Sequence, residues 1–96
     1  MTETKALSKE QIGILHHSLG MTKQNRRRPI EWWLDNDKHR NYYYASCRNP
    51  EIMARVRDLV RLGFMEAGEF ADDGMNRFFY VTQAGIIEAK KHRPEW

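Results

Sequence analysis

The fold is decided by residues 59–85, which read LVRLGFMEAGEFADDGMNRFFYVTQAG. Gly63 ends an apolar helical pattern and permits a left-handed turn into the next element. Residues 64–70 alternate loosely, and an Asp-Asp-Gly loop typical of a hairpin joins them to a second strand over residues 77–81. A threonine directly after that strand predicts the N-cap of a last helix over residues 83–92.

Two more helices are predicted before this stretch. Asn49 precedes a proline and a glutamate, and it predicts the N-cap of a helix over residues 50–62 with an apolar stripe on one face. Ser8 and Gln11 have the spacing of a capping box and predict a helix over residues 8–19. The chain is therefore expected to combine three helices with short strands.

The segment between the first two helices allows more than one interpretation. Pro29 either opens a short helix that reaches Leu34 or precedes an extended segment. Residues 41–45 are rich in tyrosine and predict a short strand, with Tyr43 on the face opposite the two other tyrosines. We expect at least half of the aromatic rings of this region to fill the core.

Size and composition restrict the class of protein. At 96 residues and 11.5 kDa the chain has room for a single domain, residues 1–96, with disordered tails at 1–6 and 93–96. We expect no membrane span and no signal peptide, because apolar runs are short and the first residues are polar. A lone cysteine, Cys47, cannot form an internal disulfide, which favours a cytoplasmic protein.

The histidines and the cysteine do not form a catalytic or metal-binding pattern. His16 and His17 are adjacent in the first predicted helix, so their side chains point about 100° apart and cannot hold one metal together. His39 and Cys47 lack the paired spacing of a zinc site. We therefore expect a protein without enzymatic activity, metal or cofactor.

The net charge of +3 hides an uneven distribution along the chain. Residues 23–48 hold seven basic side chains against three acidic ones, for a net charge of +4. Residues 49–76 hold three basic side chains against six acidic ones, for a net charge of −3. A function must therefore account for an acidic hairpin that follows a basic, aromatic segment.

The order of elements resembles a known family. Leu59–Met65 and Phe79–Gly85, on either side of the hairpin, resemble the helix–wing signature of MarR-like and PadR-like winged helix-turn-helix domains. The likeness covers about residues 50–92, and Arg40–Tyr44 also resembles a strand in small bacteriophage and prophage proteins. The resemblance implies a small phage-derived protein of the α+β class, a winged helix-turn-helix with three helices and a small antiparallel β-hairpin or sheet.

The resemblance also implies binding to duplex DNA, as a transcriptional regulator or accessory factor. In such folds the second helix of the motif enters the major groove, and residues 50–62 would be that helix here. The candidate DNA contacts are arginines of a basic arm, this helix and the hairpin: Arg26, Arg27, Arg28, Arg55, Arg57, Arg61 and Arg77. The acidic side chains of the hairpin oppose this hypothesis, because they repel phosphate.

The alternative hypothesis is a protein-binding module that docks onto host machinery, for example a defence complex, and inhibits or redirects it. Exposed aromatic and arginine side chains are typical of binding hot spots, and an acidic patch suits a basic partner. The candidate partner contacts are Trp33, Arg40, Tyr43, Glu66, Glu69, Asp72 and Asp73. Trp33 and Tyr43 belong to this set if both of their segments are strands.

Two further hypotheses have weaker support in the sequence. Exposed tryptophan or tyrosine side chains beside Arg26–Arg28 would suit single-stranded nucleic acid, because its bases can stack on such rings. A homodimer is possible, and it would use the helix at residues 8–19 or the helix at residues 83–92.

Overall fold

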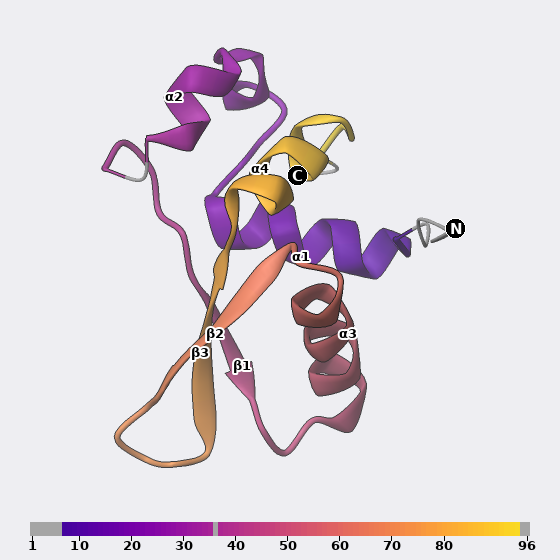
Figure 1. Cartoon of the computed structure of the whole chain (residues 1–96), viewed down its shortest axis with the longest axis vertical. Coiled ribbons are helices and arrows are strands. Elements are labelled where there is room, and N and C mark those ends of the chain that lie inside the picture. Colours follow the sequence, from indigo (N-terminus) through magenta and orange to yellow (C-terminus); the bar gives the residue numbers. More distant parts are fainter. Residues whose placement is uncertain (1–6, 36, 95–96) are drawn as a thin grey trace.

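The structure is a computed structural model that describes residues 7–35 and 37–94 (Figure 1). The α-helices are α1 (Lys9–Leu19), α2 (Ile30–Leu34), α3 (Pro50–Arg61) and α4 (Gln83–Lys90). A short 3-10 helix, η1 (Asn25–Arg27), lies between α1 and α2. The strands are β1 (Tyr43–Ser46), β2 (Met65–Phe70) and β3 (Asn76–Val81). Most of the two expected tails lies outside the described residues, but Pro94 is described and buried.

The fold is α+β, with one antiparallel sheet whose strands lie in the order β1–β3–β2. The helices α1, α3 and α4 pack against the sheet, and α2 packs against α4 (Figure 1). The buried strand residues Ala45, Met65 and Phe79 belong to the same core as the apolar sides of these helices. The sheet therefore turns one face to the helices and leaves the other face to solvent.

The ends of the helices follow the capping residues that the sequence predicts. Ser8 and Gln11 form the capping box of α1, and the Asn49 side chain accepts hydrogen bonds from two backbone N–H groups of α3. Gly63 adopts a left-handed conformation (φ 86°) after α3, and Thr82 caps α4. The last helix ends at Lys90, two residues before the predicted boundary.

The segment after Pro29 is a helix, and this overturns one predicted partner contact. As part of the five-residue α2, Trp33 is fully buried in the core, so its indole is not available to a partner. The prediction for Trp33 required an extended segment, in which alternate side chains face solvent. Trp32 is instead the half-buried neighbour, and the Arg28 guanidinium lies 4.5 Å from its ring centroid.

The two faces of β1 are assigned the other way round from the sequence interpretation. Tyr43 lies opposite Phe79, whose side chain is buried, and it packs partly buried against the core. Tyr42 and Tyr44 are the exposed tyrosines, with relative exposures of 42% and 47%. Tyr43 as a partner contact stays a prediction, for a side chain that faces the helices and is only partly exposed.

The connections between the helices differ from the resemblance. The described residues form four α-helices rather than three. A ten-residue connection that contains η1 separates α1 from α2, the strand β1 separates α2 from α3, and the hairpin separates α3 from α4. Within the described chain, no two α-helices are joined by the short turn of a helix-turn-helix.

Candidate functional site

The face of the sheet that points away from the helices carries a cluster of aromatic rings. Phe78 on β3 lies opposite Tyr44 on β1, and their ring centroids are 5.0 Å apart in an edge-on arrangement. Tyr42 approaches the same phenylalanine ring edge-on at 6.1 Å. Two residues further along β3, Tyr80 lies on the same side of the strand. We call these four residues the aromatic face.

A glycine on β2 makes room for one of these rings. A Cβ atom at Gly68 would lie 2.4 Å from the ring of Tyr80, so any side chain there would displace the ring. The Tyr80 hydroxyl then donates a hydrogen bond to Glu69 at 2.7 Å. The ring is thus held between the strand and a carboxylate, which limits its motion before any partner binds.

Charged groups surround the aromatic face. The Arg40 guanidinium lies 5.0 Å from the ring centroid of Tyr42, within cation–π distance. Glu66, on β2, lies opposite Tyr80 of β3. The Tyr44 hydroxyl approaches a carboxylate oxygen of Asp73 at 3.5 Å. Three exposed carboxylates, those of Glu66, Glu69 and Asp73, therefore lie beside the rings or at their edge.

Hydrogen bonds keep two of these carboxylates ionised. Donation by the Tyr80 hydroxyl lowers the pKa of Glu69. The backbone N–H of Met75, followed by the side-chain amide of Asn76, lowers the pKa of Asp73. Both side chains are fully exposed, so the effect concerns charge rather than stability. The rim of the aromatic face is consequently negative at neutral pH.

The structure brings together four of the predicted partner contacts. Arg40, Glu66, Glu69 and Asp73 lie at the aromatic face, whereas Asp72 is exposed in the hairpin loop. The rings of the aromatic face were missed in the sequence. The alternation along β1 and β3 is a signal for them, but only the register shows which side of each strand is outside.

The predicted DNA contacts are not brought together in the same way. Arg26, Arg27 and Arg28 belong to η1 and its end, at the opposite end of the molecule from the hairpin loop (Figure 1). Arg55, Arg57 and Arg61 lie on α3, and Arg77 lies on β3. Arg61 is paired with Asp58, one turn before it, which offsets its charge. Of the seven, Arg57 and Arg77 line one cavity between α3 and the hairpin, and Arg27 and Arg28 line a separate hollow beside η1.

The described part of the chain holds neither a cluster of metal ligands nor a helix that could cross a membrane. Residues 7–35 and 37–94 contain no group of three His, Cys, Asp or Glu side chains arranged to hold a metal ion. No helix in these ranges has the length and apolar character needed to cross a membrane. No protein-family model matches the chain, and neither a curated protein nor a solved structure is found to be similar to it.

Proposed function

We propose that this protein is a binding module that docks a protein partner through the aromatic face. The observation that carries this proposal is an aromatic cluster on a sheet face that no helix covers, in which Tyr42 and Tyr44 each lie edge-on against Phe78. Rings fixed in this way present apolar area at a low entropic cost, and tyrosine is enriched at binding hot spots.

The charge around the rings favours a protein over a nucleic acid. Bases can stack on exposed tyrosines, but the phosphates that accompany them would meet the carboxylates of Glu66, Glu69 and Asp73. Arg40 is the one basic side chain in contact with a ring of this face among the described residues. A partner with basic side chains around an apolar centre is complementary to this arrangement. The resemblance to small phage proteins suggests host machinery as the source of that partner.

Binding to duplex DNA is the second candidate function, and we infer a winged-helix-like arrangement to go with it. The strand order β1–β3–β2, with α3 directly before the hairpin, supports this inference. Arg57 is exposed on α3, in the position of a reading helix. The separation of the basic groups and the missing short turn between helices make this function less well supported than protein binding.

A charge-reversal experiment tests the first proposal. The partner is captured from host lysate with the wild-type protein, and its affinity is then measured for Glu69→Lys. We expect weaker binding, mainly through slower association, and a smaller dependence on salt. Glu10→Lys is the matched control, because Glu10 is exposed on α1, away from the aromatic face. Equal loss in both variants would show that only net charge matters and would contradict docking at this face.

A mobility shift on duplex DNA tests the second candidate. If α3 reads DNA, the protein shifts a duplex at low salt, and replacing Arg57 with alanine weakens the shift and flattens its salt dependence. Absence of a shift at low salt would exclude duplex binding. This result would leave the proposal for the aromatic face intact, since the two surfaces lie on different elements.

A further inference from the structure

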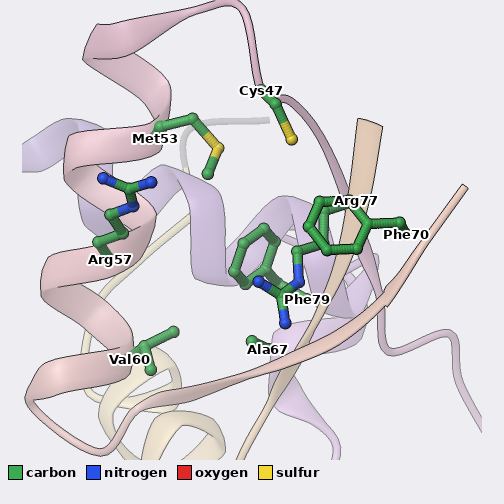
Figure 2. A pocket seen from close by; sticks show the side chains of 8 residues that line it. All are labelled: Cys47, Met53, Arg57, Val60, Ala67, Phe70, Arg77 and Phe79. Carbon is green, nitrogen blue, oxygen red and sulfur yellow. The ribbon is translucent and has the colours of Figure 1, made fainter. Parts of the chain in front are cut away.

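A cavity of about 310 Å³ lies between α3 and the β2–β3 hairpin, on the side of the sheet opposite the aromatic face (Figure 2). Its apolar wall comes from Met53 and Val60 of α3 and from Ala67 and Phe79 of the hairpin. Two arginines, Arg57 from the helix and Arg77 from β3, line this otherwise apolar space. In Figure 2 the Arg77 side chain extends from the strand into the space, and the Arg57 side chain lies along the helix at its edge.

The Arg77 side chain is fixed in place before any ligand binds. Its Nε–H donates a hydrogen bond to the Gly68 carbonyl oxygen at 2.9 Å. Its guanidinium also lies 4.6 Å from the ring centroid of Phe70. A guanidinium has five N–H donors, so the terminal nitrogens retain donors for a ligand. The fixed geometry reduces the ordering cost of binding an anion.

The charge of the cavity is not balanced by the protein. None of the side chains that line it is acidic. In the described part of the chain, neither Arg57 nor Arg77 forms an ion pair with a carboxylate. A positively charged, largely apolar cavity is complementary to a molecule with one anionic end and an apolar body.

We infer that this cavity binds a small apolar monocarboxylate, with the carboxylate on Arg57 and Arg77 and the body against Met53, Val60 and Phe79. The volume lies at the lower end of the range for small-molecule sites, which suits a ligand of about ten non-hydrogen atoms. No hydroxyl or amide side chain is among those that line the cavity, so the wall has no groups to orient a sugar or a base.

Titration calorimetry with octanoate and 3-phenylpropanoate tests this inference. Both probes should bind the wild-type protein, whereas octan-1-ol and acetate, which lack the charge or the apolar body, should bind much more weakly. Arg57→Gln should raise the dissociation constant of both probes about tenfold or more, the loss expected for a charge-assisted hydrogen bond. Arg61→Gln is the matched control, because it lies one turn further along α3 and does not line the cavity.

Cys47 provides a second measurement that does not depend on the stability of any variant. Its thiol is exposed and lines the cavity, and it is the only cysteine of the chain (Figure 2). Bound octanoate should slow alkylation of this thiol by iodoacetamide, and acetate should not. Absence of binding by both probes up to about 10 mM would overturn the inference. So would equal affinity of wild-type protein and Arg57→Gln.

Discussion

Replacing Gly85 with alanine tests how closely α4 approaches the hairpin. Gly85 lies in the first turn of α4 and is buried. A Cβ atom there would lie 2.1 Å from the carbonyl oxygen of Phe64 and 2.6 Å from Cγ1 of Val81. The carbonyl cannot retreat freely, because it accepts a hydrogen bond from the Thr82 backbone N–H at 3.0 Å. The added methyl group must therefore shift α4 or the strand end.

Two opposing effects set the size of this change. Alanine in place of glycine stabilises a helix by about 0.5–1 kcal/mol. Overpacking costs roughly 1–3 kcal/mol, and the 2.1 Å approach to a backbone oxygen favours the upper half of that range, so Gly85→Ala should lower the free energy of unfolding by about 1–2 kcal/mol. For a domain of this size, that loss corresponds to a decrease in Tm of roughly 4–16 °C. Urea denaturation and thermal melts followed by circular dichroism measure both quantities.

Gly13 provides the matched control on α1. Apart from its chain neighbours and the nearby backbone of α1, no atom lies within 4 Å of a Cβ placed at Gly13. Only the higher helix propensity of alanine therefore affects stability at this position. Gly13→Ala should therefore raise the free energy of unfolding by up to about 1 kcal/mol. If Gly85→Ala were as stable as the wild type, or if both variants changed stability alike, the close approach of α4 to Phe64 would be refuted.

Three further predictions concern single polar side chains. Asn49→Ala should lower the free energy of unfolding by about 1 kcal/mol in urea, because the side chain caps α3 through two backbone N–H groups. Asn41→Ala should reduce amide-exchange protection at Val81, whose backbone N–H and carbonyl both hydrogen-bond to the asparagine side chain. Burial lowers the pKa of His16 below its ordinary value of 6.5, so as the pH falls this side chain is protonated in the unfolded chain before it is protonated in the folded one. Stability should be full above about pH 6.5 and fall below it, and His16→Gln should flatten that decline.

Local signals in the sequence predict the ends of the elements because a cap needs only its neighbours. Ser8, Asn49 and Thr82 cap the helices for which they were proposed. The hairpin loop also lies where the Asp-Asp-Gly pattern places it, and Gly74 adopts a left-handed conformation there (φ 68°). These features depend on hydrogen bonds over three or four residues, so no tertiary contact is needed to infer them.

The buried face of β1 could not be predicted in this way. A strand alternates its side chains, so a shift of one residue exchanges the two faces. The pairing of Tyr43 with Phe79, more than thirty residues later, decides that Tyr44 faces solvent. The segment after Pro29 was ambiguous for a different reason. Five residues are too few to show a period, and packing of α2 on α4 buries Trp33.

The charged part of the candidate site was easier to predict than its aromatic part. The exposure of carboxylates such as those of Glu66 and Glu69 can be predicted in any strand register, because burying an unpaired charge is costly. Phe78 and Tyr80 were not among the candidates, because an aromatic residue in a strand can serve either the core or a surface. Only the three-stranded arrangement distinguishes these rings from the buried Phe79.

The central claim, that the aromatic face docks a protein partner, is tested most directly by the affinity of Tyr44→Ala for the captured partner. Loss of this ring should weaken binding by about 2 kcal/mol or more, which is roughly thirtyfold in Kd. Ile87→Ala is the matched control, because Ile87 is similarly exposed (46%) on α4. Unchanged affinity for Tyr44→Ala, or an equal loss in both variants, would contradict the claim.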